Sequence, residues 1–175
     1  MNDWIARAID LGADAAQVIH PDQVAVAEWV RLKCQYGCGE YGMRLTCPPY
    51  SPTPEYTRQV LRHYRQALLL RVEGAGGGEE EENRQRRRLG QAVADLEREL
   101  FLAGYQRAWG MGAGPCSFCE TCNLAGPCRF TRLARPSMEA CGIDVYTTVR
   151  QAGWEIEVVQ TEQSPFRLFS LVLMD

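Results

Sequence analysis

Residues 114–128 read GPCSFCETCNLAGPC and carry four cysteines with the spacing C-x-x-C-x-x-C-x5-C. Two residues between thiolates allow a tight loop to direct several sulfurs at one centre, and three such sulfurs with a fourth nearby hold an iron–sulfur cube. A Gly-Pro pair precedes the first and the last of these cysteines, so both ends of the loop begin with a rigid turn. We therefore predict a [4Fe-4S] cluster as the cofactor of this loop, with four ligands: Cys116, Cys119, Cys122 and Cys128.

Zinc is the alternative cofactor. All-cysteine zinc sites also use C-x-x-C pairs, but they usually place the two pairs well apart in the sequence, so three cysteines in strict C-x-x-C-x-x-C favour a cluster. Ferredoxin-type runs have three residues before the last cysteine and a proline after it, whereas this chain has five residues and no proline. The longer gap allows Cys128 to fold back onto the same cluster. Arg129 and Arg132 are the candidate cations for balancing four thiolate charges.

A second group of cysteines lies earlier in the chain, where Cys34, Cys38 and Cys47 have the spacing C-x3-C-x8-C. Glycines between them let the backbone pass close to a metal, and the prolines that follow Cys47 give the loop a rigid end. The spacing differs from the C-x3-C-x2-C of radical adenosylmethionine enzymes. We predict a second metal centre on these three thiols, either a second cluster or a zinc ion.

Three thiolates leave one coordination position of this centre without a cysteine from its own group. Cys141, the remaining cysteine, is a candidate metal ligand, and the other interpretation of it is a small buried side chain beside a helical turn. Without Cys141, an open position would hold water, a substrate or a carboxylate such as Glu40, and an open metal makes a site catalytic or Lewis-acidic. The spacing also allows the two groups to face each other and share ligands around fewer metals.

Composition describes an ordinary globular chain and excludes several classes of protein. The 175 residues are 46% hydrophobic and 23% charged with a net charge of −3, which predicts a single domain over 1–175 and argues against a nucleic-acid partner. The apolar run over residues 67–70 is far shorter than the roughly 20 residues needed to cross a membrane. We expect no secretory leader and a cytoplasmic location, where the eight cysteines act as metal ligands more readily than as disulfides.

Periodicity and turn residues predict one sheet flanked by helices, of the α/β or α+β class, with both cysteine-rich loops on the same scaffold. Helices are expected over 4–11, after Thr53, from 79 to about 100, and from 145 to 152 after Asp144. Strands are expected over 15–19, 67–72, 105–111, 154–159 and 166–174. Residues 24–32 are expected to form either a strand or an irregular segment, and a loop is expected from Cys34 to Pro52.

Few other residues offer chemistry. His20 and His63 are the only histidines, so no Ser/His/Asp or Cys/His constellation is arguable. The glycines over 74–78 lack the pattern of a phosphate-binding loop and run into four glutamates. The arginines over 84–88 are better explained as partners of those glutamates than as a phosphate or nucleic-acid contact.

Three segments together resemble a known family. They are Cys47-Pro48-Pro49, the loop that begins at Gly114, and residues 135–145, RPSMEACGIDV. The likeness extends from about Ala15 to Val158 and is to a prokaryotic family of predicted metal-binding proteins of unknown function. It implies a small cysteine-rich domain with iron–sulfur or other metal centres. The likeness also implies that Cys141 matches a position that varies within the family. The seven cysteines that it implies as ligands are Cys34, Cys38, Cys47, Cys116, Cys119, Cys122 and Cys128.

The sequence therefore predicts an iron–sulfur protein that transfers electrons to or from a partner redox protein. The alternatives are a structural zinc protein whose cysteine loops stabilise an adaptor surface, and a metalloenzyme with an open metal at the three-cysteine loop. Each of these depends on metal bound by thiolates, and they differ in the metal and in whether one coordination position is open.

Overall fold

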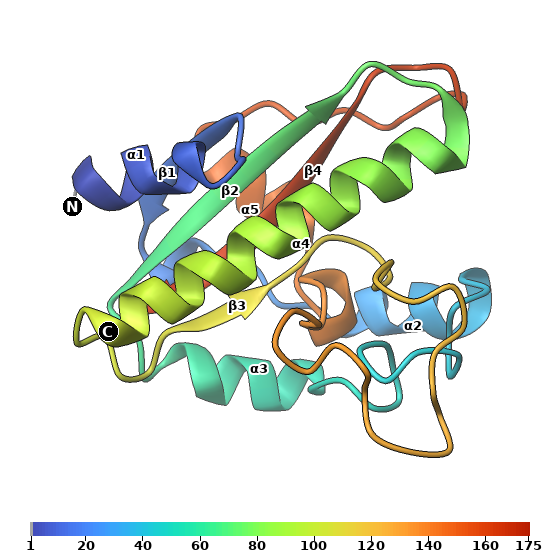
Figure 1. Cartoon of the computed structure of the whole chain (residues 1–175), viewed down its shortest axis with the longest axis horizontal. Coiled ribbons are helices and arrows are strands. Elements are labelled where there is room, and N and C mark those ends of the chain that lie inside the picture. The colour runs from blue at the N-terminus through green and yellow to red at the C-terminus, as the bar shows by residue number, and fades with distance from the viewer. Residues whose placement is uncertain (1) are drawn as a thin grey trace.

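A computed structural model of the chain describes residues 2–175 and shows one four-stranded sheet in the order β1-β2-β4-β3, with every neighbouring pair antiparallel (Figure 1). An antiparallel sheet with flanking helices is the α+β alternative of the predicted fold class. The strands are β1 (Ala15–Ile19), β2 (Gln66–Gly74), β3 (Trp109–Met111) and β4 (Phe166–Met174). The helices are α1 (Asn2–Asp10), α2 (Glu28–Gly37), α3 (Pro54–Leu61), α4 (Gly78–Leu102) and α5 (Val145–Gln151), with two 3₁₀ turns, η1 (Pro21–Gln23) and η2 (Glu139–Cys141).

The two central strands, β2 and β4, are buried on both faces. One face of the sheet packs on α1 and α4, where Leu68 and Leu70 of β2 meet Leu96 of α4. The opposite face packs on α3, α5 and the segment around η2, where Leu69 of β2 meets Val149 of α5. Because both faces are covered, these strands read as continuous apolar runs, and the run predicted over 67–72 is confirmed as part of β2.

Most helix starts follow their predicted caps. The hydroxyl of Thr53 accepts a hydrogen bond from the backbone N–H of Tyr56 at 3.2 Å and begins α3. The carboxylate of Asp144 accepts one from Thr147 N–H at 3.0 Å and begins α5. The stripe spaced four, three and four along α4 is buried, as predicted: Leu89, Val93, Leu96 and Leu100.

The structure corrects the region before the first cysteine loop. Residues 28–37 form α2, so Cys34 lies on a helix and the loop proper begins at Cys38. The apolar periodicity of this helix is weak because Val30 is buried while Trp29, Leu32 and Tyr36 are exposed to solvent. A helix that faces its apolar residues outward does not produce the pattern on which prediction depends.

Two strand predictions are also corrected. Residues 154–159 pair with no strand, although Ile156 is buried between exposed neighbours as the alternation indicated. Trp154 instead packs on Phe169 of β4, with a ring-centroid distance of 6.2 Å. The segment therefore lies on a face of the sheet and adds no strand to its edge. The strand predicted over 105–111 is reduced to Trp109–Met111, because the chain turns where Ala108 N–H donates to the carbonyl of Tyr105.

No helix within residues 2–175 combines the length and the apolar character that crossing a membrane requires.

Gly110 lets β3 pass close under α4, which places the second cysteine loop. A Cβ atom at this position would lie 2.4 Å from Cγ1 of Val93, a contact that requires α4 or β3 to move. We predict that Gly110→Ala lowers the free energy of unfolding by about 1–3 kcal/mol, the usual cost of overpacking. The measurement is urea denaturation of the reduced, metal-free chain. Gly112→Ala is the matched control, because its nearest atom is 3.9 Å away, and equal losses in both variants would contradict the prediction.

Candidate metal centres

The second cysteine loop leaves the sheet after β3 and returns to it at η2. Its base is closed by two backbone hydrogen bonds, from Gly112 N–H to the carbonyl of Pro136 at 2.9 Å and from Met138 N–H to the carbonyl of Gly112 at 3.1 Å. The four cysteines of the run therefore lie on a closed excursion of about two dozen residues whose two ends are held side by side.

An ion pair with α4 holds the end of this loop. The guanidinium of Arg135 donates to both carboxylate oxygens of Glu97, at 2.8 and 2.6 Å, and both side chains are largely buried. The same carboxylate accepts the backbone N–H of Gly110 at 2.7 Å. This hydrogen bonding raises the pKa of the Arg135 guanidinium. One carboxylate thus holds both the strand before the loop and the last residues of the loop.

The middle of the loop also rests on α4. Arg87 donates to the carbonyl of Ser117 at 2.7 Å, and the ring of Phe118 lies over Gly90, where a Cβ atom would come within 3.1 Å of it. Arg84 and Arg86 pair with glutamates of the preceding turn, as predicted for this arginine cluster. Arg87 has the additional role of positioning the cysteine loop.

The two cysteine loops face each other at one end of the molecule (Figure 1). Arg44 of the first loop donates to the carbonyl of Cys119 at 2.9 Å, and the backbone N–H of Leu45 donates to the sulfur of Cys122 at 3.4 Å. Spacing had allowed this arrangement without requiring it. This contact joins the two loops, while the charge interactions between cysteines stay within each group.

Backbone N–H groups point at sulfurs of the second group. Besides the bond to Cys122, Phe130 N–H donates to the sulfur of Cys128 at 3.4 Å, and the N–H of Phe118 acts to lower the pKa of Cys116. Burial has the larger effect and raises that pKa, together with the charges of neighbouring cysteines. The N–H groups favour the thiolate form that a metal needs.

The cation beside these sulfurs is Arg44 and not one of the two arginines that sequence proximity indicated. The charge of Arg44 acts to lower the pKa of Cys116, and its own pKa is raised, first by the hydrogen bonds that it donates to Glu40. Arg129 reaches only the carbonyl of Thr121, at 3.5 Å, and Arg132 is exposed. Arg44 was missed because it lies 75 positions away from the carbonyl of Cys119 that it binds.

The three cysteines of the first group lie on two adjoining segments, α2 and the loop that follows it. Cys34 lies in the last turn of α2, Cys38 caps that helix, and Cys47 is buried in the loop that follows. Burial, with smaller contributions from the charges of Cys38, Glu40 and Cys34, raises the pKa of Cys47 to about 12. Burial also raises the pKa of Cys34, with a contribution from Cys38.

The two predicted candidates for the fourth position have other contacts. Glu40 binds Arg44 through both carboxylate oxygens, at 2.7 and 3.2 Å. Cys141 is fully buried in the core on the α3 and α5 face of the sheet, and burial raises the pKa of its thiol to about 12. The Cys141 thiol is thus packed like an apolar side chain, and its role as a metal ligand stays a prediction.

The donor chemistry of both groups suits a thiophilic metal, although the side chains are not gathered around one point. All eight cysteines are free thiols. Between residues 2 and 175, no three His, Cys, Asp or Glu side chains lie close enough together to hold one ion. Metal binding therefore requires cysteine side chains to rotate toward a common point, which couples binding to local ordering.

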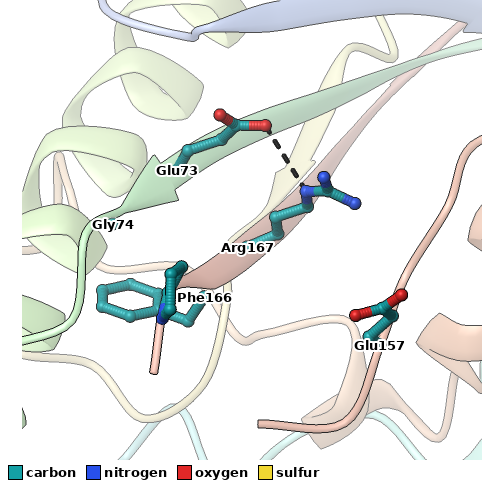
Figure 2. Close-up of a pocket in the computed structure, with 6 residues that line it drawn as sticks. Glu73, Gly74, Glu157, Phe166 and Arg167 are labelled. Atoms are coloured by element: carbon teal, nitrogen blue, oxygen red, sulfur yellow. Dashed lines mark ion pairs between the residues drawn. The ribbon is translucent and has the colours of Figure 1, made fainter. Parts of the chain in front are cut away.

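A pocket away from the cysteines lies at the end of β2 and the start of β4 (Figure 2). Its wall includes Glu73 and Arg167, which form an ion pair at 3.4 Å, and Glu73 also pairs with Arg71 at 3.3 Å. No cysteine lines this pocket. Since Glu73 and Arg167 neutralise each other, the facing cysteine loops are the better candidate site.

The chain matches the model of a family described as Predicted metal-binding protein (DUF2284) over residues 17–174, a range that contains all eight cysteines. No curated protein and no solved structure matches it significantly.

The Glu97 anchor is testable by its effect on stability. Glu97→Ala leaves the Arg135 guanidinium and the Gly110 N–H without their partner, so we expect the free energy of unfolding to fall by about 2–4 kcal/mol. Urea denaturation of the metal-free chain measures the change. Glu99→Ala is the control. Glu99 lies on α4 like Glu97 and makes a similar bidentate ion pair with Arg7 of α1, but in a more exposed position. The loss of free energy of unfolding in this variant should therefore be much smaller. Similar losses would show that Glu97 is not an anchor.

The reactivity of the thiols should follow their burial. At pH 8 a thiol with a pKa of about 12 is ionised in only about one molecule in ten thousand, so Cys47 and Cys141 should react slowly with iodoacetamide in the reduced, metal-free chain. The exposed Cys38 should react first. Peptide mass spectrometry resolves the rates, and the urea-unfolded chain is the control in which all eight should react alike. Equal rates for Cys38 and Cys141 in the folded chain would contradict this.

Proposed function

The chain belongs to a family of predicted metal-binding proteins, and from this premise we propose that it is an iron–sulfur protein that exchanges single electrons with a partner redox protein. The proposed cluster is a [4Fe-4S] centre held by the second group: Cys116, Cys119, Cys122 and Cys128. When bound, such a cluster supplies one-electron oxidation and reduction.

The observation that carries the proposal is the hydrogen bonding to sulfur. Leu45 N–H donates to Cys122 from the opposite loop, and Phe130 N–H donates to Cys128 from within the loop. N–H donors stabilise negative charge on thiolate sulfur, and such bonds are among the features that set the potential of a cluster. Both donors are backbone N–H groups of the two loops.

Arg44 supports the same proposal through charge. Four thiolates place a large negative charge in one loop, and the Arg44 guanidinium lies beside them with only 16% of its side chain exposed. Limited exposure to water reduces the screening of this charge. Arg44 also spans the two loops, so its position depends on the first loop as well as the second.

The surface around the loops suits a transient partner. The sulfurs of the second group are partly exposed, which leaves a short path to the surface for an electron. Large apolar side chains are also exposed on the two loops and at the end of α2, and exposed apolar side chains are common where another protein docks. These exposed residues are Tyr36, Met43, Tyr50, Leu124 and Phe130.

The test is metal analysis of chain produced anaerobically with ample iron. We expect about four iron and four sulfide for the second group, brown absorbance, and an electron paramagnetic resonance signal after reduction. Cys119→Ser should remove that signal. Glu120→Ala is the matched control in the same loop, because its exposed side chain has no predicted role, and it should retain the signal. Stoichiometric zinc without iron or redox activity would overturn the proposal and favour the structural zinc protein.

A further inference from the structure

Glu139, in η2, has a buried carboxylate oxygen without a partner. Its Oε2 atom is inaccessible to solvent and accepts no hydrogen bond from any residue between 2 and 175. Two other carboxylates described in this range have a similar atom, but Glu81 pairs with Arg84 and Asp175 pairs with Arg107 at 3.0 Å. Glu139 has no ion pair within the described chain. A buried carboxylate oxygen without a donor is unfavourable, and a bound cation would satisfy it.

Glu139 lies beside the first cysteine group. The 3₁₀ turn that carries it packs on α2, whose last turn carries Cys34. The end of the first loop also contacts η2, where the hydroxyl of Ser51 donates to the carbonyl of Ala140. Packing therefore brings four ligand-type side chains, carried by α2, the first loop and η2, to the same part of the molecule.

Arg31 holds these three segments together without neutralising Glu139. Its guanidinium donates to the carbonyl of Pro52 at 2.9 Å and to the carbonyl of Ala140 at 2.7 Å, and it also contacts Ser51. The hydroxyl of Ser51 donates to the carbonyl of Ala140 at 2.6 Å. The helix, the end of the first loop and η2 are thus fixed relative to one another, while the Glu139 carboxylate remains unpaired.

We propose that Glu139 is the fourth ligand of one divalent transition-metal ion, of the Zn²⁺ or Fe²⁺ type, held with Cys34, Cys38 and Cys47. Three thiolates and one carboxylate make up a four-coordinate donor set of the kind that these ions accept. The proposal rests on the metal binding proposed above and extends it to the first group. It replaces Glu40, which is bound to Arg44, and leaves Cys141 in the core.

The test follows thiol protection while Zn²⁺ is added to the reduced, metal-free full-length chain. Alkylation followed by peptide mass spectrometry reports each cysteine separately, so the two groups are measured in one experiment. We expect Cys34, Cys38 and Cys47 to become protected together. Glu139→Ala and Glu139→Gln should raise the Zn²⁺ concentration needed for half protection by about 10- to 100-fold, a typical cost of disturbing a metal site. Glu139→Cys, which supplies a fourth thiolate, should restore affinity and become protected itself.

The outcomes separate the inference from the proposed function. Protection of the second group should be unchanged in all three variants, and far-UV circular dichroism of each variant reports whether the chain is still folded. If Glu139→Ala unfolds the chain, the isosteric Glu139→Gln decides. Unchanged protection of the first group in the Gln variant would overturn Glu139 as a ligand and leave metal binding intact. Wild-type chain in which the first group is never protected would also overturn it, whereas failure at the second group alone would count against the proposed cluster.

Discussion

A largely buried carboxylate on α4, Glu97, is the constraint on which the placement of the second cysteine loop depends. It accepts hydrogen bonds from Gly110 on β3 and from Arg135 at the end of the loop. A long excursion with few apolar residues of its own cannot fold on its own core. Closing both ends on one rigid helix reduces the conformations open to the loop, and the contacts of Arg87 and Phe118 with α4 reduce them further.

The first loop depends on a similar device built around a cation. Arg31 binds carbonyls from the end of that loop and from η2, and Arg44 reaches across to the carbonyl of Cys119 in the second loop. Both arginines are only partly exposed, and each joins segments that are distant in the sequence. The two cysteine groups therefore lie near each other on one framework, which agrees with a proposed role in which two metal centres work close to a partner.

Local patterns predicted much of the fold, because the contacts that produce them are local. Thr53 and Asp144 cap helices through hydrogen bonds to residues three positions on, and the stripe along α4 is visible in the sequence. The predictions were wrong where the buried side chains do not follow the spacing of apolar residues in the sequence. Helix α2 turns apolar side chains such as Trp29 toward solvent, and the segment at Trp154 alternates like a strand but packs across the sheet instead of pairing with it.

The sequence by itself limited how far apart the thiols of each group can lie, since cysteines within a short stretch of chain stay close whatever the rest of the chain does. Only the tertiary structure decided which groups surround those thiols. The N–H of Leu45 and the guanidinium of Arg44 reach the second cysteine group from another part of the chain, and the turn that carries Glu139 packs on the helix that carries Cys34. Their positions follow from how helices and loops pack around the sheet, and the spacing of residues along one segment carries no record of that packing.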